Sequence, residues 1–158
     1  TYISNMVVFG IVEFKPPFVG FVILAIINYK LFKMNVKEIT KRAYDLFNNG
    51  DIETFFNEIV DDNITWIFPG DKHPLSGTHR GKQAMMMAMS KIPDLWNNLT
   101  VEPVFMIAEG NKVFTKLNAK AEGMDTIFGH YSELNDQGKL INFMTFDDTL
   151  SMVNAIKS

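Results

Sequence analysis

The residues best suited to chemistry lie near the end of the chain. Asp147 follows an apolar, strand-like run, and His130 stands in the strand-like segment before that run. A carboxylate in an apolar cavity can remove a proton next to a carbonyl group, and a histidine can donate a hydrogen bond to the oxyanion that forms. These residue types therefore predict an acid/base pair, with Asp147 as the base and His130 as its partner.

Both residues also have simpler explanations. Short acidic residues commonly cap helices, and either Asp147 or Asp148 is expected to cap the last helix, with Asp148 better placed for that role. A single histidine is often a core or subunit-interface residue whose nitrogens are satisfied by their neighbours. The catalytic interpretation and these alternatives all stay open at the level of sequence.

Aromatic side chains are numerous enough to line a cavity around this pair. Trp66, Phe68 and Phe128 are the main candidates for substrate binding, and Tyr44 and Asp71 are secondary ones. Aromatic residues at these spacings belong to a core first, so only those that face inward are expected to contact a substrate.

The loop that contains His73 and His79 is a poor candidate for a metal site. The two histidines lack the spacing of ligands on one helix face, and the chain contains no cysteine that could join them. We therefore expect no metal site in this loop. His73, like Asp71, could instead lie at the mouth of a pocket and contact a polar group of a substrate.

Helical periodicity predicts three helices in the first half of the folded region. Gly50 is expected to end the first, Asp51 to cap the second, and Pro93 to end the third. The predicted helices cover residues 36–47, 51–60 and about 82–92.

Most of the remaining chain alternates apolar and polar residues, which predicts strands. Pro103 indicates an edge strand or a bulge, and the segment Asn135–Gly138 is typical of a turn. The predicted strands cover residues 64–68, 99–108, 112–121, 126–134 and 140–146, and a short helix follows them and ends near residue 156.

Several short motifs occur in an order typical of one family: Gly50-Asp51, Asp61-Asp62, Pro69-Gly70, Gly77 with Arg80-Gly81, Gly138-Lys139-Leu140 and Phe146-Asp147. Together they resemble the SnoaL-like polyketide cyclase branch of the nuclear transport factor 2 and ketosteroid isomerase superfamily. The resemblance implies an α+β fold, a cone-shaped half-barrel in which three N-terminal helices pack on a curved, mostly antiparallel sheet and a short C-terminal helix follows. It also implies a deep apolar pocket and a homodimer formed through the outer face of the sheet.

The resemblance further narrows the expected chemistry. The general base of the ketosteroid isomerases falls on Ile67 here and their tyrosine donor falls on Ala43, so steroid isomerisation by that mechanism is disfavoured. The epoxide hydrolases of the superfamily need an arginine in the late strands, where this chain has none. The polyketide cyclases use an aspartate near the end of the last strand and a histidine on the strand before it, and Asp147 and His130 stand at similar places.

The expected function is therefore that of a cofactor-independent cyclase or isomerase acting on a small apolar carbonyl compound. The alternative is a non-catalytic module of the same fold that binds a small ligand or docks another protein. A filled cavity and an exposed apolar patch, for instance at Met86 or Met87, would favour docking.

Composition bounds the remaining possibilities. The length of 158 residues suits one domain, and a net charge of −3 without a cluster of lysine and arginine disfavours nucleic acid as a partner. Residues 1–33 are strongly apolar, and we expect them to be translated upstream sequence outside the fold, which leaves a domain over residues 34–158. A membrane anchor or an ordered extension is the alternative for that segment. The expected location is cytoplasmic.

Overall fold

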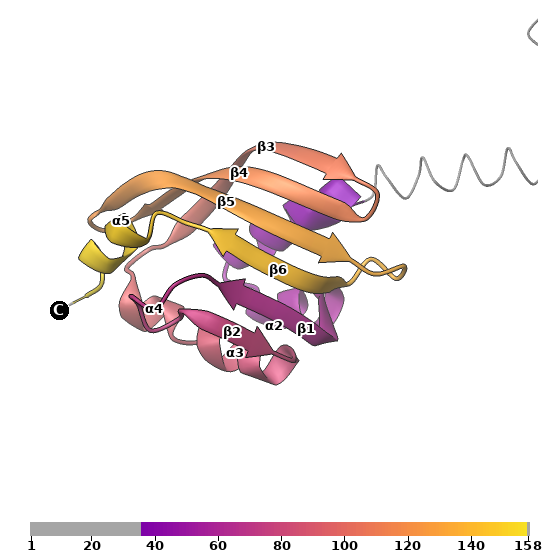
Figure 1. Ribbon diagram of the computed structural model, residues 1–158, viewed down its shortest axis with the longest axis horizontal. Coiled ribbons are helices and arrows are strands. Elements are labelled where there is room, and N and C mark those ends of the chain that lie inside the picture. The colour runs from indigo at the N-terminus through magenta and orange to yellow at the C-terminus, as the bar shows by residue number, and fades with distance from the viewer. Residues whose placement is uncertain (1–35, 158) are drawn as a thin grey trace, which may run out of the picture. The chain divides into compact units, whose positions relative to one another are not determined.

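A six-stranded sheet organises the fold, with the strand order β2-β1-β6-β5-β4-β3. The computed structural model describes residues 36–157, so the expectations for residues 1–33 lie outside the described part. Neighbouring strands run antiparallel except β1 and β6, which are parallel. The strands are β1 (Val60–Phe68), β2 (Gly77–Arg80), β3 (Thr100–Glu109), β4 (Lys112–Ala121), β5 (Met124–Leu134) and β6 (Leu140–Phe146), as Figure 1 shows.

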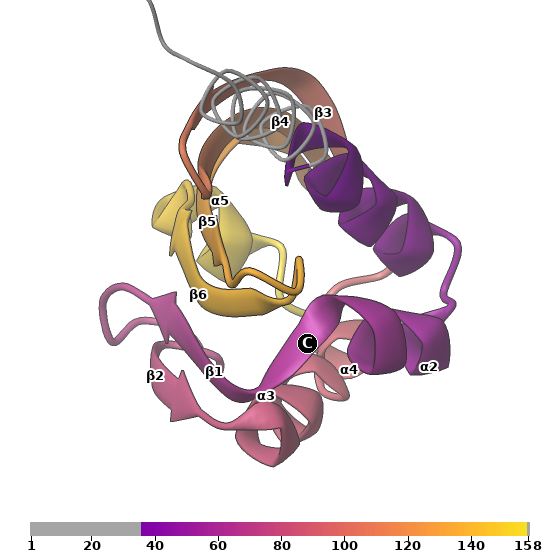
Figure 2. The ribbon, with the colours of Figure 1, turned by 90° about the vertical axis from the view of Figure 1, so that its right-hand side faces the viewer.

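The sheet is curved, and helices cover its concave side. Figure 2 shows the arc of strands with the helix of residues 36–48, here called the first helix, and α2 on the inside of the curve. The further helical elements are α2 (Ile52–Thr54), the π-helical turn η1 (Phe55–Ile59), α3 (Lys82–Met89), α4 (Ile92–Leu95) and α5 (Thr149–Asn154). The predicted α+β architecture, with helices on a mostly antiparallel sheet and a short C-terminal helix, is confirmed.

Strict alternation of side chains determines which residues face the helices. In β4, Val113, Thr115, Leu117 and Ala119 are buried while their neighbours are wholly or partly exposed. The same alternation in β5 buries His130 at 6% exposure, on the concave side. The sheet therefore presents one face to the core, and His130 belongs to that face.

Single residues begin, end or interrupt several elements where the sequence predicts it. Gly50 adopts a φ of +72° just after the first helix, a conformation that glycine enters without steric cost. The Asp51 carboxylate accepts a hydrogen bond from the Thr54 amide at 3.2 Å and so caps α2. Pro103 lies in the edge strand β3, at a shift of register against β4. These features depend on residues close in sequence.

Three segments differ from the prediction. The second helix continues as the π-helical turn Phe55–Ile59, and Val60, expected at its end, already begins β1, ahead of the predicted strand at 64–68. The third helix is divided, because α3 ends at Met89 and Pro93 lies within the first turn of the separate helix α4, where a proline removes no needed hydrogen bond. The segment Gly77–Arg80, expected to be a loop, is the strand β2 at the edge of the sheet. Its side chains are mostly exposed, so it carries no apolar alternation that could reveal a strand. Among the described helices, none is both long and apolar enough to cross a membrane.

Candidate active site

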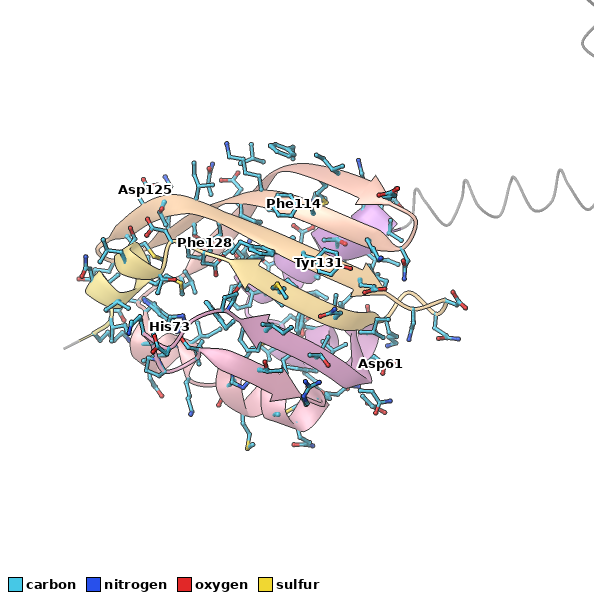
Figure 3. The ribbon with its side chains drawn as sticks, viewed as in Figure 1. Asp61, His73, Phe114, Asp125, Phe128 and Tyr131 are labelled. Carbon is cyan, nitrogen blue, oxygen red and sulfur yellow. The ribbon has the colours of Figure 1, made fainter. Side chains whose placement is uncertain are left out.

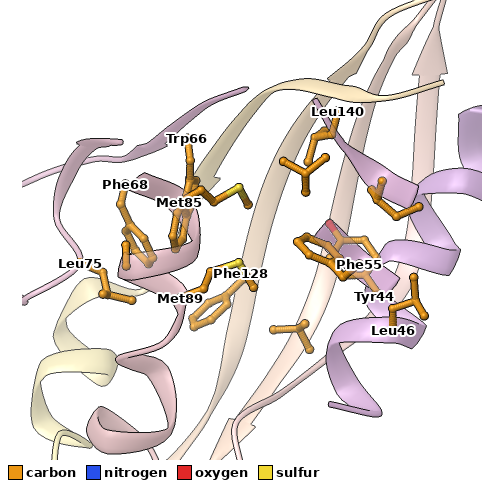
Figure 4. Close-up of a cluster of buried hydrophobic side chains, with 14 of the residues drawn as sticks. Tyr44, Leu46, Phe55, Trp66, Phe68, Leu75, Met85, Met89, Phe128 and Leu140 are labelled. Carbon is orange, nitrogen blue, oxygen red and sulfur yellow. The ribbon is translucent and has the colours of Figure 1, made fainter. Parts of the chain in front are cut away.

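A cavity of about 100 Å³ lies between the first helix, α3 and the concave face of the sheet. Its lining is almost entirely apolar: Tyr44 comes from the first helix, Met85 and Met89 from α3, and Phe128 from β5. Figure 4 shows these side chains converging from both sides. Apolar walls with a few polar atoms are the usual lining of a small-molecule site, although this cavity is smaller than the roughly 300 Å³ at which such sites begin.

The polar centre of this cavity is the pair His130 and Asp147. Nε2 of His130 lies 3.3 Å from Oδ1 of Asp147, and the side chains are only 8% and 3% exposed. The two atoms are close but not aligned for a hydrogen bond, and neither has another partner among the described residues. Both atoms are therefore buried with hydrogen-bonding capacity that no described residue uses.

Tyr44 holds the other nitrogen of His130. Its hydroxyl lies 3.1 Å from Nδ1 of His130. Burial raises the pKa of Tyr44 above its usual range. The nearby hydroxyl of Thr115, which has no aligned hydrogen-bond partner, lowers that pKa in part, and the charge of Asp147 raises it further. Tyr44 thus stays protonated. A lone pair on Nε2 of His130 would oppose the nearby carboxylate of Asp147, which favours the neutral tautomer with its hydrogen on Nε2. In that tautomer Nδ1 is the acceptor and the Tyr44 hydroxyl donates to it.

A polar row crosses the sheet at His130. Thr115 of β4 and Thr145 of β6 are its direct cross-strand neighbours. Both threonines are buried, at 0% and 2% exposure, and neither hydroxyl has a hydrogen-bond partner among the described residues. Only Thr145 lines the cavity. Since Phe143, Thr145 and Asp147 alternate on one strand and its extension, Thr145 and Asp147 point to the same side.

His73 is a second buried histidine close to the site. Its Nδ1 accepts a hydrogen bond from the amide of Leu75 at 3.2 Å, and its ring packs edge-on against Phe68 with centroids 4.4 Å apart. Burial lowers the pKa of His73, and the charge of Asp147 acts in the opposite direction with a smaller effect. His73 therefore stays neutral at neutral pH, with its proton on Nε2.

The structure brings most of the sequence-predicted site residues together. Trp66, Phe68 and Phe128 all line the cavity and are at most 5% exposed. Tyr44 also lines it but makes its polar contact with His130. Asp71 does not join them: its side chain is 79% exposed and pairs with Lys72 at 2.9 Å.

The two adjacent acids have separate places. Asp148 caps α5, accepting hydrogen bonds from the Ser151 amide at 3.1 Å and from the Ser151 hydroxyl at 2.6 Å. Asp147 is thereby left for the cavity. The cap is needed because the first amide groups of a helix have no partner within the helix. Within residues 36–157, no three histidine or acidic side chains are grouped so as to hold a metal ion.

Sequence reasoning missed Thr145 as a site residue. The signal that could have found it is its place two residues before Asp147 in a strand, since side chains at that spacing share a face. Trp66 also lines the cavity, and its indole Nε1 has no hydrogen-bond partner among the described residues. No sequence pattern indicates that this nitrogen is unpaired.

Comparison with solved structures shows the same fold in other proteins. Bal32a, from a soil-derived mobile gene cassette, superposes with a TM-score of 0.70 at 20% identity, over 79% of this chain and 98% of its own. TerC, co-crystallised with polyporic acid, superposes with a TM-score of 0.68 at 22% identity, over 78% of this chain and 98% of its own. IdmH of Streptomyces antibioticus, a candidate polyketide cyclase, superposes with a TM-score of 0.64 at 20% identity, over 75% of this chain and 95% of its own. A search of curated proteins finds no match to the chain.

A family model matches the sequence itself. The model of the SnoaL-like domain covers residues 40–148, which include the first helix from Thr40 onward, the whole sheet, and both His130 and Asp147. Matched over most of its length, the chain belongs to the family of SnoaL-like domains.

Proposed function

We propose that the protein is a cofactor-independent acid/base enzyme, of cyclase or isomerase type, that acts on a small apolar carbonyl compound. The observation that carries the proposal is the buried pair of Asp147 and His130, 3.3 Å apart in an otherwise apolar cavity. Buried polar atoms without partners cost free energy. Their convergence on one cavity therefore supports a role in binding and chemistry rather than in stability.

The first step of the proposed reaction is removal of a proton. The carboxylate of Asp147 takes the proton from the carbon next to the carbonyl group of the substrate. The electron pair of that C–H bond forms a C=C bond, and the carbonyl oxygen becomes an enolate oxyanion. His130 donates its Nε2–H to this oxygen, because protonated Asp147 attracts that hydrogen less strongly than the carboxylate did.

The second step uses the enolate carbon. In a cyclisation it attacks a second carbonyl carbon of the same molecule, a C–C bond closes the ring, and the new alkoxide takes the proton held by Asp147. In an isomerisation the proton returns from Asp147 to a different carbon. Either sequence balances without an oxidant, a reductant or a cofactor. Trp66, Phe68 and Phe128 would hold the apolar body of the substrate.

The structural neighbours support this direction. IdmH is a candidate polyketide cyclase, and TerC was crystallised with polyporic acid. Those properties belong to those proteins, since the identities near 20% carry the fold alone. We extend to this chain only the class of ligand, an apolar compound that carries a carbonyl or hydroxyl oxygen.

Hydrogen exchange tests the proposal without knowledge of the natural substrate. The full chain is incubated with 2-tetralone in heavy water, and loss of the proton next to the carbonyl is followed by NMR. We expect the protein to accelerate exchange and Asp147→Asn to slow it by about 10²- to 10⁴-fold, the usual contribution of a general base. Asp148→Asn is the matched control, because it changes the neighbouring acid, keeps the oxygen that caps α5, and leaves the cavity intact.

Two outcomes would overturn the proposal, the first for the catalytic activity and the second for Asp147 as the base. If 2-tetralone binds but its protons exchange no faster than in buffer, the cavity belongs to a non-catalytic ligand-binding module. If exchange is fast and Asp147→Asn leaves it unchanged, the base is another group.

We also propose that the protein forms a homodimer through the outer face of the sheet. Ile107, Phe114, Tyr131 and Met144 are directly opposite one another across β3, β4, β5 and β6, on the face away from the helices. Figure 3 shows Phe114 and Tyr131 on this face. Ile107 is 63% exposed and Phe114 is 40% exposed, while Tyr131 and Met144 are partly exposed. Exposed apolar side chains next to one another support a protein interface.

A further inference from the structure

The polar row across the sheet contains a hydroxyl whose place the proposed chemistry does not yet use. Thr145 lines the cavity, is 2% exposed, and its Oγ1 has no hydrogen-bond partner among the described residues. Buried hydroxyl groups usually have a hydrogen-bond partner, and a buried hydroxyl left unpaired costs free energy. A buried, unpartnered hydroxyl on the cavity wall therefore points to a ligand atom.

The position of Thr145 relative to the acid/base pair defines what that ligand atom is. Thr145 is the direct cross-strand neighbour of His130, so their Cβ atoms lie about 5 Å apart. Thr145 also precedes Asp147, just beyond the end of β6, by two residues, and both line the cavity; two residues of extended chain span about 7 Å. A substrate whose acidic carbon contacts the Asp147 carboxylate would place its carbonyl oxygen near both His130 and Thr145.

The Nε2–H donor of His130 is not fully available to a substrate oxygen before the reaction begins. Nε2 of His130 lies 3.3 Å from the Asp147 carboxylate without an aligned hydrogen bond to it. Before proton transfer, the negative charge of that carboxylate attracts the hydrogen on Nε2 and so competes with the substrate oxygen for it. A second donor that does not face Asp147 would bind the oxygen from the start. The Thr145 hydroxyl rotates freely enough to supply it.

We infer that Thr145 donates its hydroxyl to the carbonyl or enolate oxygen of the ligand and forms, with Nε2–H of His130, a two-donor oxyanion site. The ligand class follows: an apolar compound with an oxygen that accepts a hydrogen bond in the ground state and carries negative charge in the intermediate. This inference rests on the proposed function. Thr145 in this role touches the reacting oxygen, whereas Tyr44 acts only through His130.

The chain offers a closely matched control. Thr115 flanks His130 on its other side, is equally buried and has no aligned hydrogen-bond partner, but its hydroxyl lies near that of Tyr44 and it does not line the cavity. Replacement of either threonine by valine removes one hydroxyl at nearly constant volume. If burial of an unpartnered hydroxyl were all that mattered, the two substitutions would act alike.

The test measures binding of 2-naphthol, whose ionised form resembles the enolate of 2-tetralone, by its fluorescence with the full chain. We expect Thr145→Val to weaken binding about tenfold, the usual worth of one hydrogen bond to a strongly accepting oxygen. Thr145→Ser, which keeps the hydroxyl, should restore most of the affinity, and Thr115→Val should leave it near that of the wild type. Naphthalene, which lacks the oxygen, should bind all four proteins alike.

Exchange of 2-tetralone supplies the catalytic readout. Thr145→Val should slow exchange by about ten- to a hundredfold, somewhat less than loss of a full oxyanion-hole donor. The inference is overturned if Thr145→Val binds 2-naphthol like the wild type, if Thr115→Val weakens it equally, or if the wild type prefers naphthalene.

These results separate the inference from the proposed function. If Asp147→Asn slows exchange of 2-tetralone while Thr145→Val binds 2-naphthol like the wild type, the proposed enzyme stands. Thr145 is then not a donor to the ligand oxygen. If the wild type binds 2-naphthol better than naphthalene, this preference requires Thr145, and 2-tetralone does not exchange, the ligand site stands. The protein then binds a ligand without catalysis.

Discussion

The hydroxyl of Tyr44 lies 3.1 Å from Nδ1 of His130, a contact that joins the first helix to β5 across 86 positions of sequence. The two rings also stack, with centroids 5.8 Å apart and planes inclined by 28°. Through this contact the helix sets the orientation of the histidine. With its hydrogen on Nε2, the tautomer that the neighbouring Asp147 favours, the histidine accepts the hydrogen of Tyr44 at Nδ1.

Removal of the Tyr44 hydroxyl is expected to cost stability as well as activity. Tyr44→Phe leaves the buried Nδ1 of His130 without a donor, which should lower the free energy of unfolding by about 1–3 kcal/mol in urea. Exchange of 2-tetralone should fall too, because His130 loses the contact that sets its orientation. Tyr131→Phe is the control, since that hydroxyl bonds Glu133 on the outer face. Equal losses in both variants would contradict a special role for Tyr44.

Acid should destabilise the protein through His73. Burial lowers its folded-state pKa below the ordinary value of 6.5, so below about that pH the unfolded chain takes up a proton that the folded protein resists. The stability is thus complete above pH 6.5 and is lost as the pH falls toward the folded-state pKa. His73→Asn keeps an acceptor for the Leu75 amide and cannot titrate. Thermal unfolding from neutral pH to about pH 5 should show a steeper loss in the wild type than in the variant; identical slopes would exclude His73 as the cause.

The cap of α5 should respond to both substitution and pH. The Ser151 hydroxyl, the Ser151 amide and the Thr126 hydroxyl hold the pKa of Asp148 below 3.8, so its stabilising effect is present above that value and is lost as the pH falls further. Asp148→Ala should lower the melting temperature at neutral pH, and Asp148→Asn should lower it less because an oxygen remains for the Ser151 amide. If the two variants melt alike, charge rather than the hydrogen bond supplies the effect.

The outer face of the sheet should control the oligomeric state. Phe114→Glu places a charge in the middle of the apolar row, so sedimentation should show half the mass of the wild type. Met87→Glu is the matched control, because Met87 on α3 is 64% exposed and lies outside that row. A wild-type protein that sediments as a monomer would contradict the dimer directly. Mass loss with Met87→Glu alone would move the interface to α3.

Features that depend on close neighbours could be predicted from the sequence. The alternation of Val113, Thr115 and Leu117 predicts a strand, and Asp148 three residues before Ser151 predicts a helix cap, because both patterns act within a turn or a pleat. Asp147 and His130 could be named as candidates by residue type and by resemblance to a family. Their partners could not.

Tertiary structure alone decided how the site is assembled. Tyr44 contacts His130, and Thr145 lies beside it, because strand register and the angle at which the first helix crosses the sheet bring distant residues together. The exposed edge strand β2 and the outward position of Asp71 were decided in the same way. Sequence determined the elements of this protein, since local patterning sets helix and strand. Packing between elements determined its candidate chemistry, because register and crossing angle depend on contacts that no local pattern encodes.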